Sequence, residues 1–391
     1  MSLFFITLWR ALLVVANALW APFERGRGLA RGLLMLLAMP LFLIWQLILL
    51  LGLLVDNLAF RGYRRVEVRE PVFVIGPPRT GTTFLHHVLA SDPRTTTFRT
   101  WECLFATSIS LRYVGIGLSR LHRWLGAPLS RFGGRLLQKL TGPLDDIHPI
   151  RLGDPEEDFL SLMPIFACFL LIVPLPRARW LYRISRADTD LSRDEQDALL
   201  GFYRRAIQRH LYVFGRDKVF LSKNASFAGT VNCLLREFPD ARIIATVRDP
   251  LSVVPSQLSS LRPGFAACGF DNLPEGFQDS MLALLEHYYI NLAACAVRHP
   301  GHVAFIDNSE LRHRLEESVL RAYRELGLEP SPPLLERLAA PSGNTSIKAS
   351  AHRYTLDEFG LNEAGIRSRF RAVYASFDFN VGLPAAPRGD E

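Results

Sequence analysis

The stretch Val72-Phe-Val-Ile-Gly-Pro-Pro-Arg-Thr-Gly-Thr-Thr83 decides the fold of this chain. It begins with four apolar residues between Pro71 and Gly76, which is typical of a short strand buried in a parallel sheet. Residues 76–83 then have the glycine spacing of a loop whose backbone N–H groups hold phosphate oxygens at the start of a helix. The stretch therefore predicts a P-loop between a strand and a helix over residues 83–90.

The side chains of this loop differ from those of nucleotide-hydrolysing P-loops. Thr82 stands where those loops have a lysine that reaches the β- and γ-phosphates, whereas Thr83 keeps the hydroxyl position. The positive charge lies inside the loop instead, at Arg79. We expect an anion that carries less charge than a nucleoside triphosphate, bound without a required metal.

A second stretch also has a strand followed directly by polar residues that could bind phosphate. Residues 242–247 form an apolar run that predicts a strand, and Arg248-Asp-Pro follows directly. Ser256 lies eight residues after Arg248, two helical turns further along. Because the carboxyl ends of parallel strands meet at one edge of a sheet, we expect Arg248 and Ser256 to lie near the P-loop.

These motifs together resemble those of sulfotransferases that use 3′-phosphoadenosine 5′-phosphosulfate (PAPS). Residues 77–86 resemble the family's 5′-phosphosulfate loop, and residues 238–256 resemble its 3′-phosphate-binding motif. Trp101-Glu102, residues 148–158 and residues 352–361 resemble the bacterial and Golgi-like branch. The resemblance covers about residues 71–375.

The resemblance implies a three-layer α/β/α P-loop fold with a central parallel sheet. The apolar pattern agrees, because it predicts strands at residues 72–75, 219–222, 242–247 and 302–306 with helices between them. We predict a catalytic domain over residues 70–380, with a helical cap over about residues 104–215.

The resemblance also implies roles for single residues. The residues expected to bind PAPS are Arg79, Thr80, Gly81, Thr82, Thr83, Arg248 and Ser256. Lys223 is expected to stabilise the transferring sulfuryl group. Glu102 is predicted to be the general base, with its pKa raised by a closed pocket. His86 and His87 are rivals for that role, residues 156–158 are expected to cap a helix or shape the acceptor pocket, and His148, Lys348 and His352 are weaker candidates.

The N-terminal region predicts membrane attachment. Residues 32–55 are apolar and uncharged, and as a helix they would extend ~36 Å, enough to cross a hydrocarbon core of ~30 Å. Residues 2–23 are also apolar but contain Arg10. Basic residues flank both ends of the long run, so residues 1–60 are compatible with two spans, one span or a re-entrant hairpin bent at Pro40.

The composition of the chain limits the classes of partner that it could bind. The net charge of +7 suits an anionic membrane surface or substrate, and no nucleic-acid-binding motif is present. The five cysteines include no CxxC pair, which favours a reducing compartment. We therefore predict an enzyme on the cytoplasmic face of a bacterial inner membrane that sulfates a lipid, glycolipid or other hydrophobic alcohol. The alternatives are a P-loop kinase or NTPase, and a non-catalytic membrane-bound relative.

Overall fold

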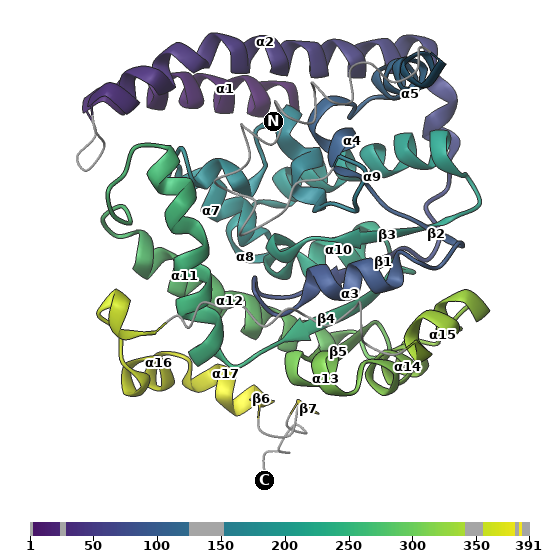
Figure 1. Ribbon diagram of the computed structural model, residues 1–391, viewed down its shortest axis with the longest axis vertical. Helices are drawn as coiled ribbons and strands as arrows, with labels where there is room; N and C mark the ends of the chain where they lie inside the picture. Colours follow the sequence, from purple (N-terminus) through teal and green to yellow (C-terminus); the bar gives the residue numbers. More distant parts are fainter. Residues whose placement is uncertain (1–2, 24–28, 125–151, 341–354, 380–382, 385–391) are drawn as a thin grey trace.

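The computed structural model describes residues 3–23, 29–124, 152–340, 355–379 and 383–384. At its centre is a parallel sheet in the order β2-β3-β1-β4-β5 (Figure 1). Its strands are β1 (Val72–Ile75), β2 (Thr95–Thr96), β3 (Val219–Lys223), β4 (Arg242–Val247) and β5 (Val303–Asp307). The predicted fold class is confirmed, and all four predicted strands are present within one residue of their expected ends.

Side chains of β1 alternate between two apolar cores, as the period of a strand requires. Phe73 and Ile75 belong to the larger core, which also contains side chains of the helices on one face of the sheet. Val72 and Val74 belong to the smaller core on the other face. Both faces of β1 are therefore dry, which explains why its sequence is continuously apolar rather than alternating.

Helices cover both faces of the sheet (Figure 1). The smaller core is covered by α3 (Thr82–Leu89), α13 (Asn308–His313), α14 (Leu315–Glu325) and α15 (Pro332–Ala339). The larger core involves α9 (Arg193–Phe214), α10 (Val231–Glu237), α11 (Pro250–Ala267), α12 (Phe277–Arg298), α16 (Glu363–Arg369) and α17 (Arg371–Ser376). A small antiparallel pair, β6 (Phe377–Asp378) and β7 (Leu383–Pro384), lies near the C-terminus.

The described part of the segment predicted as a helical cap, residues 104–124 and 152–215, is largely helical. Its helical elements are α4 (Thr100–Phe105), α5 (Ile109–Trp124), the 3₁₀ segments Asp158–Ile165 and Phe169–Ile172, α7 (Arg179–Ser185), α8 (Ala187–Asp190) and α9. Residues 125–151 of this segment lie outside the described part of the chain. The longest of these helices, α9, contacts β3 through Tyr203 and Ser222 and carries the buried polar side chains of Arg209 and His210.

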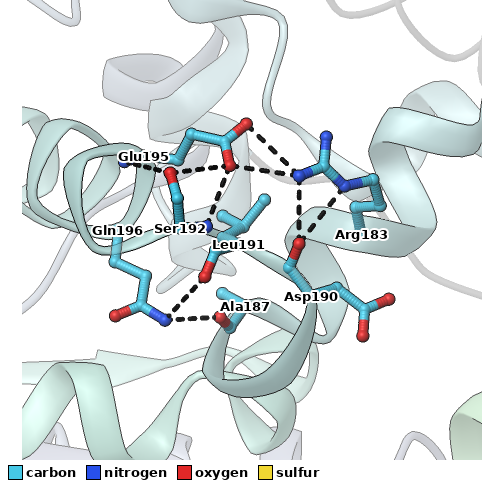
Figure 2. Close-up of polar contacts among 7 residues, drawn as sticks. All are labelled: Arg183, Ala187, Asp190, Leu191, Ser192, Glu195 and Gln196. Atoms are coloured by element: carbon cyan, nitrogen blue, oxygen red, sulfur yellow. Dashed lines mark hydrogen bonds and ion pairs between the residues drawn. The ribbon is translucent and has the colours of Figure 1, made fainter. Parts of the chain in front are cut away.

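Polar contacts at the start of α9 fix where this helix begins (Figure 2). Ser192 and Glu195 form a capping box, in which the backbone N–H of Ser192 donates to the Glu195 carboxylate at 2.9 Å. Arg183 bridges the same carboxylate, at 3.1 Å, and the carbonyl of Asp190, at 3.0 Å. Gln196 donates to two carbonyls of the preceding turn, at 2.9 and 3.1 Å. These bonds satisfy groups that a helix end leaves unpaired.

Two long apolar helices precede the sheet. They are α1 (Leu3–Trp20) and α2 (Leu29–Ala59), and they lie side by side along one side of the molecule (Figure 1). Both are long and apolar enough to cross a membrane, as is α12, although half of the apolar window of α12 is buried in the protein. The helix α2 is continuous through Pro40, so it does not reverse direction there as a hairpin bent at this residue would require.

Candidate active site

Two glycines shape the loop after β1. A methyl group on Gly76 would lie 2.3 Å from the carbonyl oxygen of Thr246, so only glycine allows β1 and β4 to approach this closely. Gly81 has a φ of 100°, and a methyl group there would lie 2.9 Å from the side-chain amide of Asn308. Arg79 also has a positive φ, 70°. The loop therefore has a conformation that few sequences adopt without strain.

Thr80 holds this loop to its neighbours. Its buried hydroxyl donates to the carbonyl of Pro77 at 2.7 Å and lies 2.6 Å from the hydroxyl of Thr246. The carbonyl of Thr80 accepts a hydrogen bond from Asn308 at 2.9 Å. The Thr80 side chain thus maintains the shape of the loop. The group of Thr80 that can contribute to the predicted ligand binding is its backbone N–H.

The next two hydroxyls are differently placed. Thr82 and Thr83 are the first two residues of α3, where backbone N–H groups are free of helical partners. Among the described residues, neither hydroxyl has a hydrogen-bond partner. Both are free to donate to an anion at the helix N-terminus, as the sequence predicts.

The structure brings Arg79, Arg248 and Ser256 together. The Nε of Arg79 donates to the Oγ of Ser256 at 3.0 Å, and Arg248 donates to the carbonyl of Arg79 at 3.3 Å. The hydroxyl of Tyr289 in turn donates to the carbonyl of Arg248 at 2.5 Å, which fixes the backbone after β4. The strand and helix pattern had predicted this meeting of two distant motifs.

A third arginine, Arg312 on α13, was missed in the sequence. Burial lowers the pKa of the Arg248 guanidinium, and the nearby charges of Arg312 and Arg79 lower it further. Within the described part of the chain, none of these three arginines is paired with a carboxylate. The signal that could have found Arg312 is its position just after β5, the strand beside β4.

Lys223 lies at the end of β3, opposite Val74 of β1, and its side chain is 1% exposed. It forms an ion pair with Glu157. The sequence did not predict this pair. His86 is buried beside them and bonds the hydroxyl of Thr97 at 2.8 Å. Burial, and then the charge of Lys223, lowers the pKa of His86 well below its ordinary value. His86 is therefore neutral, and its role as a packing residue rather than a base stays a prediction.

The environment of Glu102 differs from the expected one. Its carboxylate lies 3.1 Å from the Nε of Arg112 and 2.8 Å from the Nδ1 of His210, and it also accepts from the backbone of Arg99. Burial alone would raise the pKa of Glu102, but His210 and Arg112 outweigh it and lower that pKa. The expected raised pKa is wrong for Glu102, and its assignment as the base stays a prediction.

A raised pKa is found instead at Asp158, one residue after Glu157. Burial raises the pKa of this carboxyl to about 7. The Tyr203 hydroxyl donates to it and lies 3.1 Å from the hydroxyl of Ser222 on β3. Three other residues considered from the sequence, His148, Lys348 and His352, lie outside the described residues.

The sulfotransferase family model matches residues 71–332, from the start of β1 to the start of α15. This chain belongs to the sulfotransferase family. Stf3 proteins of Mycobacterium bovis and Mycobacterium tuberculosis, each named omega-hydroxy-beta-dihydromenaquinone-9 sulfotransferase, are 25% identical to it over 294 residues. The match covers 74% of this chain and 71% of each relative.

Solved structures of sulfotransferases have the same fold. The structure of STF1 from Mycobacterium tuberculosis H37Rv has a TM-score of 0.68 at 18% identity, and the match covers 93% of this chain and 91% of STF1. The structure of STF9 from Mycobacterium avium has a TM-score of 0.63 at 18% identity, over 84% of this chain and 81% of STF9. This sulfotransferase therefore shares its architecture with enzymes of the same class.

Proposed function

We propose that this sulfotransferase transfers a sulfuryl group from PAPS to a hydroxyl of a lipid-like acceptor at a membrane surface. The observation that carries the proposal is the meeting of Arg79, Arg248 and Ser256 at the P-loop, where the charge of Arg312 also acts on Arg248 and no described carboxylate forms an ion pair with any of the three arginines. A bound ligand with two anionic groups would supply the missing negative charge.

The residues of the loop fit such a ligand. PAPS, when bound, supplies a sulfuryl group on its 5′-phosphosulfate and a second anionic group at its 3′-phosphate. The backbone of the loop, with the free hydroxyls of Thr82 and Thr83, would hold the 5′-group. Arg248 and Ser256 would hold the 3′-phosphate. Because Gly81 has no side chain, the loop backbone can pack closely against Asn308 and Leu311 of α13. Arg79 contacts Ser256 and so would lie between the two anionic groups.

The transfer needs a group that accepts the proton of the acceptor hydroxyl. Glu102, the base predicted from the sequence, is 1% exposed, and both of its carboxylate oxygens have partners. Glu157 is more accessible, with a side chain that is 21% exposed, and it contacts Lys223. We propose Glu157 as the proton acceptor, with Lys223 next to it to stabilise negative charge on the transferring group.

Three observations support a lipid-like acceptor and a cytoplasmic site. The curated relatives are named for a hydroxylated dihydromenaquinone, and α1 and α2 give this chain an apolar N-terminal region. None of the five cysteines forms a disulfide bond in the described part of the chain, and four of them are buried. Free thiols are typical of proteins from reducing compartments, which supports the cytoplasmic face.

Calorimetric titration of the detergent-purified protein tests the donor. We expect 3′-phosphoadenosine 5′-phosphate to bind more tightly than ATP with Mg²⁺, because the loop has no lysine for a γ-phosphate. A preference for ATP would indicate a kinase or NTPase instead. Failure to bind either nucleotide would favour a non-catalytic relative.

Mass spectrometry of lipid extracts tests the acceptor. We expect a lipid that gains one sulfate in cells expressing the protein and loses it with Arg79→Ala. A sulfated product found solely in the aqueous fraction would contradict the lipid-like acceptor while keeping the sulfotransferase activity.

A further inference from the structure

An extended apolar surface remains exposed on α1, α2 and α5, which we call the apolar face. These three helices lie together along one side of the molecule, away from α16 and α17 (Figure 1). The face is made of Phe4, Phe5, Leu8, Trp9, Leu12, Leu19 and Trp20 of α1; Leu33, Leu37, Leu41, Ile44, Leu47, Ile48, Leu51, Leu54 and Leu58 of α2; and Tyr113, Val114, Leu118, Leu121 and Trp124 of α5. An apolar patch of this size marks a surface that contacts a membrane or a protein.

The opposite side of α2 is held to the catalytic domain over most of its length. Met39, Gln46, Leu49, Leu53 and Asp56 are buried at helical spacing. The distance along the helix from the first to the last of them is ~26 Å. A helix packed sideways against a folded domain over this length cannot also lie across the hydrocarbon core of a bilayer, because polar parts of the domain would have to enter it.

Directed polar contacts hold the helices in this position. The indole of Trp45 donates to the carbonyl of Leu104 at 2.8 Å. The carboxylate of Asp56 accepts from the backbone N–H of Ile109 at 2.7 Å and pairs with Arg209 at 3.1 Å.

The helix α1 has a contact of the same kind. Its buried Arg10 donates to the carbonyl of Ile165 at 3.2 Å. An arginine in the middle of a membrane span would be costly, whereas here its charge is directed into the protein. The charged groups Arg10 and Asp56 therefore face the domain, while the side of each helix that stays exposed is apolar.

Charged residues at the ends of the apolar face indicate what covers it. Arg61, Arg64 and Arg65 follow α2, and Arg120 and Arg123 lie on α5; all five are exposed. Exposed arginines beside an apolar helical surface suit an anionic headgroup layer, and Trp9, Trp20 and Trp124 suit its interfacial zone.

We propose that α1, α2 and α5 lie in the plane of the membrane, with the apolar face inserted into one leaflet of an anionic phospholipid bilayer. The chain then does not span the bilayer, although α1 and α2 are long enough to do so. The contribution of α5 is what separates this arrangement from a spanning hairpin, because α5 comes from the catalytic domain and is not a candidate span.

Vesicle binding by the full-length protein tests the proposal. We expect the protein, diluted from detergent, to float with phosphatidylglycerol-containing vesicles and to bind pure phosphatidylcholine vesicles more weakly. The double variant Leu118→Glu, Leu121→Glu on α5 should weaken binding to the anionic vesicles about tenfold or more, because two apolar anchors are lost. Unchanged binding of this variant, or equal binding to both vesicle types, would overturn the proposal.

Val297→Glu provides the matched control. Val297 is 73% exposed but lies on α12, outside the apolar face. The control should bind vesicles like the wild type, and all variants should keep the wild-type circular dichroism spectrum. If the wild type instead forms a stable dimer without lipid and the α5 variant is monomeric, the apolar face is an interface between two copies.

Labelling at the two ends of α2 tests the topology directly. Single variants Leu29→Cys and Arg61→Cys, which lie at the two ends of α2 and outside the apolar face, are bound to preformed sealed vesicles and treated with a membrane-impermeant maleimide. An in-plane helix predicts equal labelling of the two positions from outside. Protection of one position until detergent is added would show a span and contradict the proposal.

Discussion

Burial lowers the pKa of the Arg248 guanidinium, and the charges of Arg312 and Arg79 add to this effect. Negative charge placed between the three residues should therefore bind strongly. We expect Arg248→Ala and Arg312→Ala each to weaken binding of 3′-phosphoadenosine 5′-phosphate by about tenfold to a hundredfold, as the loss of a charge-assisted hydrogen bond would. Calorimetry against Arg314→Ala, an exposed arginine just past α13, provides the comparison. Equal affinities would remove Arg312 from the site.

Glu157 and Glu102 have different surroundings, so we expect their replacement by glutamine to have different effects. Glu157→Gln should lower kcat by ~10²–10⁴, the usual contribution of a general base, and should leave nucleotide affinity unchanged. Glu102→Gln should instead destabilise the fold, because Arg112 stays buried without its carboxylate partner. Steady-state kinetics and chemical denaturation of both variants check this. A stable Glu102→Gln protein with strongly reduced kcat would favour Glu102 as the base.

The carboxyl of Asp158 makes stability depend on pH. Its pKa is about 7 in the folded protein and near 3.8 when unfolded, so the folded state retains the proton more tightly. The free energy of unfolding should therefore fall as pH rises from about 4 to above 7, by about 4 kcal/mol at most. Denaturation at several pH values checks this. The Asp158→Asn variant should lose most of this slope, and an unchanged slope would assign it to other groups.

Single residues were predictable where a motif and a strand end coincide. Arg79, Arg248 and Ser256 satisfy this condition, and the structure brings them together. The partners of Glu102 could not be predicted, because His210 is 108 positions away on a different helix. Burial and two partners determine the pKa of Glu102, and none of these is visible in the local sequence.

Among the elements, α9 is stabilised by the polar contacts of its first turn. Its capping box and the Arg183 bridge satisfy groups that would otherwise need water (Figure 2). Ser192→Ala should lower the free energy of unfolding by about 1 kcal/mol, the usual cost of losing such a cap. Urea denaturation measures it, and nucleotide affinity should be unchanged. Ser192→Asp, which can still cap, should retain most of the wild-type stability.

Element boundaries were predicted less well than element types. The apolar pattern predicts a helix between the strands at residues 219–222 and 242–247, but the structure has a 3₁₀ segment, Ala225–Gly229, followed by α10. The break lies at Thr230, whose φ of −132° and ψ of 8° are not helical. Gly229 before it allows a close approach to Ser185, because a methyl group there would lie 1.8 Å from the carbonyl oxygen of Ser185. The two-residue strand β2 was missed since Thr95 and Thr96 have no apolar pattern; β3 positions them.

At the scale of the whole molecule, the N-terminal helices share a core with the enzyme. Val14, Ala18, Met39 and Leu53 belong to the same buried cluster as Phe73 of β1. Sequence reasoning expected residues 1–60 to be a membrane anchor followed by a catalytic domain. Hydropathy could identify the apolar helices, but it could not show which of their faces packs on the protein.

Because of this shared core, the helices should be needed for folding as well as for membrane attachment. Deletion of residues 1–60 would expose the apolar surface beneath α1 and α2, so we expect an aggregated protein by size-exclusion chromatography. Asp56→Ala provides a milder variant: it leaves Arg209 buried without its partner and should cost ~3–5 kcal/mol of stability. A monomeric truncated protein with wild-type nucleotide affinity would show that the catalytic domain folds alone. In that case the contacts of Trp45, Asp56 and Arg10 would serve membrane positioning without contributing to the fold.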